Sequence, residues 1–219
     1  MNFILGAISL LVTFGLVVLI EKLFKKEGLF VWIGISTIIA NILVCKSIDL
    51  LGFTTNLGNI MFASNFLATD IICEKYSFKE SKKAVMLGLC SQIIFLLITQ
   101  LSLAYIPNEV DTIQSSMENL FSLNLRVSIA SMIMYFFSNM VDIYLFEFIK
   151  RKVPSKLWLR NNVATIVSNC LENYFFNFLA FLGIYDLKTI FIIATSTTII
   201  EILLAVCDTP FLYLAEKSK

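Results

Sequence analysis

Seven long apolar stretches alternate with short polar connections along this sequence of 219 residues. They cover residues 2–20, 29–45, 57–73, 84–106, 125–149, 163–185 and 189–214. About 20 apolar residues are enough for a helix to cross a bilayer, so the pattern predicts seven transmembrane helices. The connections are too short to hold a soluble domain. The longest connection, 107–124, has apolar residues at helical spacing and predicts a short amphipathic helix.

The sixth stretch carries a polar stripe along one side of its expected helix. Its members are Asn162, Thr165, Asn169, Glu172 and Asn173. On a helical projection they fall within an arc of roughly 100°. An ionised carboxylate at the centre of a bilayer costs at least roughly 2.5 kcal/mol, so a group at that depth normally faces a protein interior or a wet cavity. The stripe therefore predicts a polar site inside the membrane.

The fifth stretch repeats this pattern. Ser128, Ser131, Tyr135, Ser138 and Asp142 lie within an arc of roughly 80° on its helix. Residues 138–146 and 168–176 also share the pattern S-N-x-x-[DE]-x-Y-x-F. Transporters often place binding sites between internal repeats. We expect the two helices to run in opposite directions, because they are adjacent spans.

Other stretches add single polar residues at membrane depth. They include Thr37, Asn41, Asn59, Asn65, Asp70, Gln92 and Glu201. Serine, threonine, asparagine and glutamine often serve only as hydrogen-bonding contacts between helices. For Asp142, Glu172 and Glu201 the structural alternative is an ion pair, yet Arg126 is the only basic residue within a span. These carboxyl groups are therefore expected either to be protonated or to bind a cationic group.

Composition supports the membrane class and excludes several kinds of site. Hydrophobic residues make up 58% of the chain, charged residues only 15%, and the mean hydropathy is +0.84. The absence of histidine excludes histidine proton relays, triads and metal sites. The five cysteines are scattered without a C-x-x-C pair, and no phosphate-binding loop is present. No cofactor, metal or nucleic-acid partner is expected.

Loop charge predicts the orientation of the chain. Of the 17 lysines and arginines, 14 fall in connections on one side, including the C-terminal Lys217 and Lys219. The positive-inside rule then places the N-terminus outside and the C-terminus in the cytoplasm. The first stretch has no preceding basic residue and very few polar ones, so we interpret it as a retained anchor helix. The expected organisation is an anchor helix with its basic loop at 1–28 and a six-helix core at 29–219.

Several short motifs resemble those of the bacterial queuosine precursor transporters. They are Leu51-Gly52-Phe53 to Asn56, Phe66-Leu67-Ala68-Thr69-Asp70-Ile71, Asp142-Ile143-Tyr144-Leu145-Phe146, Arg160-Asn161-Asn162, Phe178-Leu179-Ala180-Phe181 and Thr209-Pro210-Phe211-Leu212-Tyr213. The resemblance covers the second stretch to the C-terminus. It implies an all-α polytopic protein of the bacterial inner membrane, with a six-helix core akin to the substrate-binding subunits of energy-coupling-factor importers. The implied substrates are 7-deazaguanines such as queuine and the aminomethyl and nitrile precursors, and no covalent chemistry is implied.

The family pattern points to Asn41, Asp70, Asp142 and Glu172, with departures in this chain. Asn139 and Asn169 stand where relatives often have glutamine, and Glu201 stands where many have lysine. Glu172 replaces the aspartate usual in the sixth helix. The full set predicted to bind substrate is Asn41, Asn65, Asp70, Gln92, Asn139, Asp142, Asn169, Glu172, Asn173 and Glu201.

Alternative functions stay open from the residues alone. One is a vitamin-binding subunit that depends on partner ATPase subunits. Assembly of the chain as a homodimer also stays open. Another is a membrane enzyme with paired carboxylates, which lacks support because no G-x-G-D-type pairing is present. A scaffold protein would leave the buried carboxylates unexplained.

Overall fold

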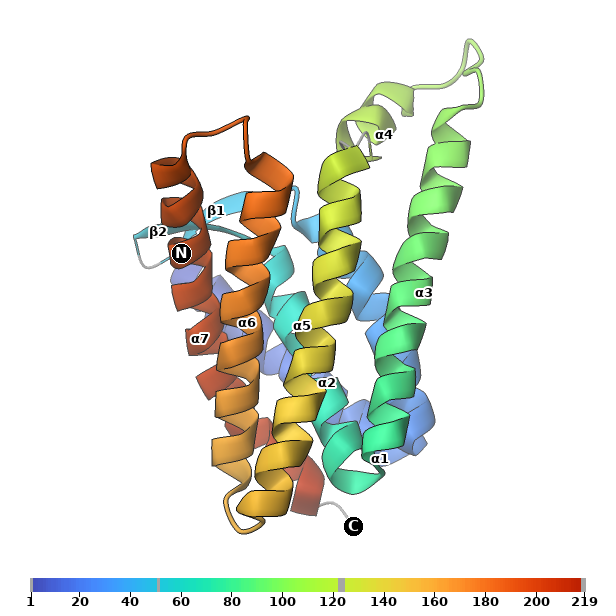
Figure 1. The fold of residues 1–219 in the computed structure, drawn as a ribbon. Helices are drawn as coiled ribbons and strands as arrows, with labels where there is room; N and C mark the ends of the chain where they lie inside the picture. The colour runs from blue at the N-terminus through green and yellow to red at the C-terminus, as the bar shows by residue number, and fades with distance from the viewer. Residues whose placement is uncertain (1, 51, 122–124, 218–219) are drawn as a thin grey trace.

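The computed structural model of the chain describes residues 2–50, 52–121 and 125–217. It is a bundle of helices with one β-hairpin (Figure 1). The elements are α1 (Asn2–Leu43), β1 (Ser47–Leu50), β2 (Phe53–Asn56), α2 (Gly58–Lys75), α3 (Phe78–Leu103), α4 (Gln114–Phe121), α5 (Leu125–Lys152), α6 (Leu157–Phe181) and α7 (Leu187–Lys217). Lys219, counted above among the basic residues of one side, lies outside the described residues.

Helix α1 consists of two arms that meet at Lys25. The backbone of Lys25 is not helical, with φ 57° and ψ −143°. A straight helix of 42 residues would be roughly 63 Å long. Instead, Asn2 donates a hydrogen bond of 3.1 Å to the carbonyl of Asp49, just beyond the other end of α1. The chain therefore reverses at Lys25, and the two arms are the first and second predicted spans.

The reversal brings the two arms into close contact next to Gly28. A Cβ atom at this position would lie 2.6 Å from a methyl carbon of Ile20 and 2.9 Å from the Ile20 carbonyl oxygen. Only glycine fits such an approach without displacing the backbone. The first arm also packs against the bundle, because Phe14 is fully buried and meets Phe211 of α7 edge to face at 5.5 Å.

The third to seventh predicted spans correspond to α2, α3, α5, α6 and α7, with shifted ends. Helix α3 begins at Phe78 rather than 84, because the side chain of Ser77 accepts a hydrogen bond of 3.2 Å from the backbone N–H of Glu80. Asp186 precedes α7 and accepts hydrogen bonds from the Thr189 hydroxyl (2.6 Å) and backbone N–H (3.2 Å). These bonds hold the pKa of Asp186 below its ordinary value.

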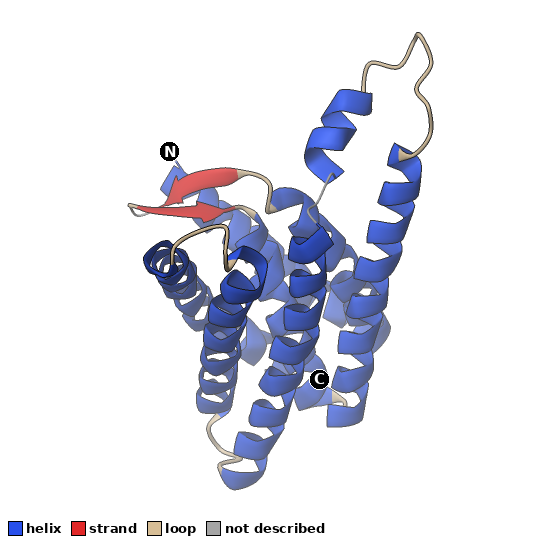
Figure 2. Cartoon of the chain, turned by 45° about the horizontal axis from the view of Figure 1, so that its top comes forward, coloured by secondary structure: helices blue, strands red, loops and turns tan. Residues whose placement is uncertain are grey.

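The predicted short helix in the connection 107–124 is confirmed as α4, whereas the hairpin was not predicted. Strands β1 and β2 pair antiparallel from Ser47 opposite Asn56 to Leu50 opposite Phe53. Figure 2 shows the hairpin across the end of the bundle where the N-terminus lies. Strands of four residues give too short a pattern to be recognised against the apolar background.

The helical membrane class is confirmed. Among the described residues, α1, α3, α5 and α7 are long and apolar enough to cross a membrane. Helices α2 and α6 carry more polar residues, and those of α6 lie mainly on its buried face, whereas Val167 and Phe175 on its other face are exposed. The stretch from Ala63 to Cys73 of α2 is buried throughout. Large apolar side chains such as Leu11, Ile94, Phe137 and Leu203 are exposed on outer faces of the bundle, as expected for contact with lipid.

Candidate functional site

A cavity of about 380 Å³ occupies the half of the bundle nearest the hairpin. Its volume is within the range of small-molecule sites. The lining comes from α1, α2, α3, α5, α6, α7 and the end of β2. Its polar side chains are Thr37, Asn41, Asn56, Asn59, Gln92, Ser128, Ser131, Tyr135, Glu172, Asn173, Asn177, Thr197 and Glu201.

One wall of the cavity carries two carboxyl groups. Glu172 of α6 and Glu201 of α7 both line it and lie close enough to interact electrostatically. The amide of Asn173 donates a hydrogen bond of 2.5 Å to Oε2 of Glu201. Oε2 of Glu172 is buried and has no hydrogen-bond partner. The wall therefore presents strong acceptors with unused capacity.

Amide side chains around the cavity are held by the protein through their N–H groups. Asn41 donates to the carbonyl of Thr37 (2.8 Å), Asn59 to the hydroxyl of Thr55 (2.9 Å) and Asn177 to the carbonyl of Asn173 (2.7 Å). Gln92 donates to Ser131 over 3.3 Å. Its Oε1 atom is buried without a partner. These amides are oriented before any ligand arrives.

Aromatic rings supply flat surface on the α2 and α5 side. Phe62 and Tyr135 meet edge to face at 6.2 Å, and Phe176 and Phe181 of α6 also line the cavity. Tyr135 is 1% exposed, and its hydroxyl packs directly against Gly88 of α3, where a Cβ atom would clash with it. Glycine at position 88 thus sets the position of the Tyr135 ring.

A second polar cluster lies deeper, away from the hairpin. Asp70 of α2, Asp142 of α5 and Asp208 of α7 are fully buried and neighbour one another. Asn161 donates a hydrogen bond of 2.6 Å to Oδ1 of Asp208, and Ser168 donates one of 3.2 Å to Oδ1 of Asp142. Both carboxyl oxygens of Asp70 and one each of Asp142 and Asp208 have no hydrogen-bond partner.

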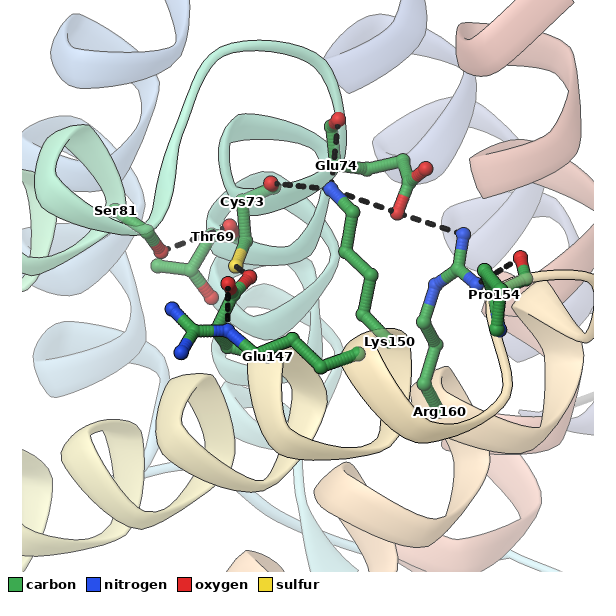
Figure 3. Close-up of polar contacts among 9 residues, drawn as sticks. Thr69, Cys73, Glu74, Ser81, Glu147, Lys150, Pro154 and Arg160 are labelled. Carbon is green, nitrogen blue, oxygen red and sulfur yellow. Dashed lines mark hydrogen bonds and ion pairs between the residues drawn. The ribbon is translucent and has the colours of Figure 1, made fainter.

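Ion pairs close the bundle at the end opposite the hairpin. Figure 3 shows Glu74, at the end of α2, between Arg160 of α6 (2.8 Å) and Lys150 of α5 (3.4 Å). Lys150 also donates to the backbone carbonyls of Cys73 and Glu74, each at 3.0 Å. These contacts tie the end of α2 to both α5 and α6.

A second ion pair at this end ties α2 to the first arm of α1. Lys75 lies 2.7 Å from the fully buried carboxylate of Glu21 and donates to the carbonyl of Ala215 in α7 at 2.9 Å. Tyr76 donates a hydrogen bond of 3.0 Å to the same carboxylate. Burial and the neighbouring Glu21 raise the pKa of Tyr76. The end of α2 is therefore bound by charge to α1, α5 and α6.

The structure divides the ten predicted site residues into separate groups. Asn41, Gln92, Glu172, Asn173 and Glu201 line the cavity, whereas Asp70 and Asp142 belong to the deeper cluster.

The other three predicted residues are buried and do not line the cavity. Asn65 donates to Thr37 (3.2 Å) and accepts from Ser36, and Asn139 donates to the carbonyl of Tyr135 (2.8 Å). Asn169 is 2% exposed, with an unpartnered Oδ1.

The prediction missed several cavity residues. Asn177 lies one helical turn beyond Asn173, so extending the stripe of α6 by one turn identifies it. Asn59 is a polar residue of its span but does not belong to the predicted set. Phe176 carries no sequence signal, because aromatic residues are common on lipid-facing surfaces as well.

Comparisons with known proteins agree with the membrane architecture. A family described as "Putative vitamin uptake transporter" matches residues 56–215. A protein of Bacillus subtilis (strain 168) named "Probable queuosine precursor transporter" is 38% identical over 209 residues, covering 94% of this chain and 91% of that protein. No solved structure matches the chain significantly.

Proposed function

This chain belongs to the vitamin uptake transporter family, and from that premise we propose that it transports queuosine precursors across the membrane through the cavity described above. The substrate class comes from the relative named as a queuosine precursor transporter, which the chain resembles over nearly its whole length. The expected substrates are 7-deazaguanines, namely queuine and its aminomethyl and nitrile precursors.

The composition of the cavity is the observation that carries this proposal. A 7-deazaguanine is a flat, fused ring whose edges carry both hydrogen-bond donors and acceptors. Aromatic side chains such as Phe62 and Tyr135 suit the faces of such a ring, and amides such as Asn41 and Gln92 suit its edges. Glu172 and Glu201 add acceptors for its N–H groups. Binding and release of an unchanged ligand need no covalent chemistry, so we expect no catalytic residue.

Alternating access is the proposed mechanism. The cavity reaches from Glu172 toward the hairpin end, where Asn56 and Phe181 line it, while Glu74, Lys150 and Arg160 close the opposite end. Opening one end while closing the other would move a ligand past the deeper cluster. Asp70 and Asp142 are therefore proposed to meet substrate only after that change.

The proposed orientation follows from loop charge. The hairpin end and the N-terminus face the outside of the bacterial inner membrane, and the basic end and the C-terminus face the cytoplasm. The proposed organisation is an N-terminal anchor at 1–28 and a six-helix core at 29–219, in which α2 and α6 also cross. The lipid bilayer and a small-molecule substrate are the expected partners.

A growth and modification assay tests the proposed function. A bacterial strain unable to make queuosine precursors is given this chain and fed each precursor separately, and queuosine is measured in its tRNA. We expect restoration by the wild-type chain and loss with Glu172→Ala at equal protein level in the membrane. Failure of the wild-type chain to restore queuosine from any precursor would contradict the proposal.

Co-purification addresses the alternative of a subunit within a larger importer. The chain is purified under mild conditions, and associated proteins and its oligomeric state are identified. Recovery of a stoichiometric ATPase module would favour an energy-coupling-factor arrangement. Transport by the chain alone in reconstituted vesicles would exclude a requirement for such a module.

A further inference from the structure

The two carboxyl groups of the cavity face no basic side chain among its lining residues. Glu172 and Glu201 are the charged residues in that lining, and neither lysine nor arginine is part of it. The ion pairs found between described residues involve Glu21, Glu74, Glu80 and Glu147, all outside the cavity. Arg126, next to the lining residue Val127, donates from Nε to the carbonyl of Leu179 at 2.6 Å. The cavity wall therefore carries two acidic groups and no basic partner among its lining residues.

The two carboxyl groups also keep unused hydrogen-bonding capacity. Glu201 accepts through Oε2 from Asn173, and the hydroxyl of Ser138 faces the Glu172 carboxyl. Oε2 of Glu172 is shielded from solvent and has no partner. A carboxylate held away from water without a cation is unfavourable, and a ligand with a positive charge offsets that cost. An ammonium group has three N–H donors, enough to bridge both carboxyl groups.

The neutral part of the cavity leaves room for the ring of such a ligand. Phe62 and Tyr135, from α2 and α5, form the aromatic surface, whereas the carboxyl groups come from α6 and α7. A ligand with a flat ring at one end and an amine at the other matches this division. A neutral, linear nitrile has only a weak acceptor to offer, which two carboxyl groups do not bind.

Building on the proposed function, we infer that this cavity selects 7-deazaguanines that carry a protonated amine over those that carry a nitrile. Glu172 and Glu201 bind the amine, and Asn173 orients the carboxyl group of Glu201. The aminomethyl precursor and queuine, which both contain an amine, are the preferred ligands. The nitrile precursor binds through the ring alone.

Competition in reconstituted vesicles tests the inference. Uptake of labelled aminomethyl precursor is measured against unlabelled aminomethyl and nitrile compounds. In the wild-type chain, half-inhibition by the nitrile compound should require a concentration roughly tenfold higher than half-inhibition by the unlabelled aminomethyl compound. This ratio is equivalent to a difference in binding free energy of about 1.4 kcal/mol. In the Glu172→Gln and Glu201→Gln variants, the half-inhibition concentrations of the two compounds should differ by no more than roughly threefold, about 0.7 kcal/mol. Glu109→Gln, on the exposed loop before α4, serves as the control that keeps the wild-type ratio.

The outcomes separate the inference from the proposed function. Uptake of both compounds with no preference for the amine in the wild-type chain would overturn the inference alone. Transport of neither compound, and of no queuine either, would overturn the proposed function and the inference with it. If one glutamine variant fails to fold, the other variant and the wild-type ratio still decide the question. An unchanged ratio in a folded Glu201→Gln chain would remove Glu201 from the amine site.

Discussion

The hydroxyl of Ser168 on α6 donates a hydrogen bond of 3.2 Å to the carboxyl group of Asp142 on α5. The same arrangement occurs with the helices exchanged, because Ser138 on α5 faces Glu172 on α6. These residues occupy equivalent positions of the repeat S-N-x-x-[DE]. The short connection between α5 and α6 makes them antiparallel, so the repeat relates one acid in the cavity to another in the deeper cluster.

Removing the hydroxyl of Ser168 and removing that of Ser138 should therefore have different effects. Ser168→Ala deprives a fully buried carboxyl group of a donor, so the free energy of unfolding should fall by about 1 kcal/mol. Ser138→Ala should instead reduce uptake, because Glu172 lines the cavity. Thermal unfolding in detergent and vesicle uptake measure the two effects. Ser115→Ala, exposed on α4, is the control, and equal effects of both serine variants on uptake would contradict the prediction.

The Glu74–Arg160 ion pair should contribute strongly to closing the end of the bundle opposite the hairpin. Arg160 is 3% and Glu74 11% exposed, so Arg160→Met leaves a largely buried carboxylate with Lys150 as its remaining cation. The expected loss of unfolding free energy is about 3 kcal/mol. A double-mutant cycle with Glu74→Gln measures the coupling between the two side chains. Strict additivity of the two single changes would show that the pair does not stabilise the closed end.

Gly88→Ala should impair transport by displacing Tyr135. The added methyl group would clash with the Tyr135 hydroxyl, and the ring would be pushed toward the cavity. Overpacking of this kind costs about 1–3 kcal/mol and changes the shape of the cavity. Uptake kinetics should show a higher KM, partly restored by adding Tyr135→Phe. Gly15→Ala is the matched control, because a Cβ at Gly15 meets no atom within 4 Å.

Lys25→Gly should stabilise the chain. Lys25 adopts a positive φ of 57° with ψ −143°, a region that only glycine occupies without strain. Relief of this strain outweighs the greater freedom of glycine in the unfolded chain, for a net gain of about 1 kcal/mol. Lys22→Gly, within the regular helical arm, should instead destabilise by about 1 kcal/mol. Thermal unfolding of both variants decides whether the reversal at Lys25 is strained.

The sequence predicts the candidate site best where the signal is local. The stripe of α6 was identified from its 3.6-residue period, and Glu172 and Asn173 do line a cavity. The same stripe contains Thr165 and Asn169, which the structure places outside that cavity. A helical projection shows which side a residue faces but not how deep along the bundle a cavity extends. The sequence therefore predicts one site for all ten residues, whereas the structure places five of them in the cavity and five outside it.

The apolar pattern alone predicts the order and approximate ends of the long helices, because a bilayer requires each span to satisfy its own backbone polar groups. The family resemblance likewise came from the sequence. Only the tertiary structure decided which polar residues share a cavity. That choice depends on where the bundle is closed, and closure depends on contacts such as Glu74–Arg160 and Glu21–Lys75, between residues far apart in the chain. A residue's neighbours across helices have no fixed spacing in sequence, so no periodicity reveals them.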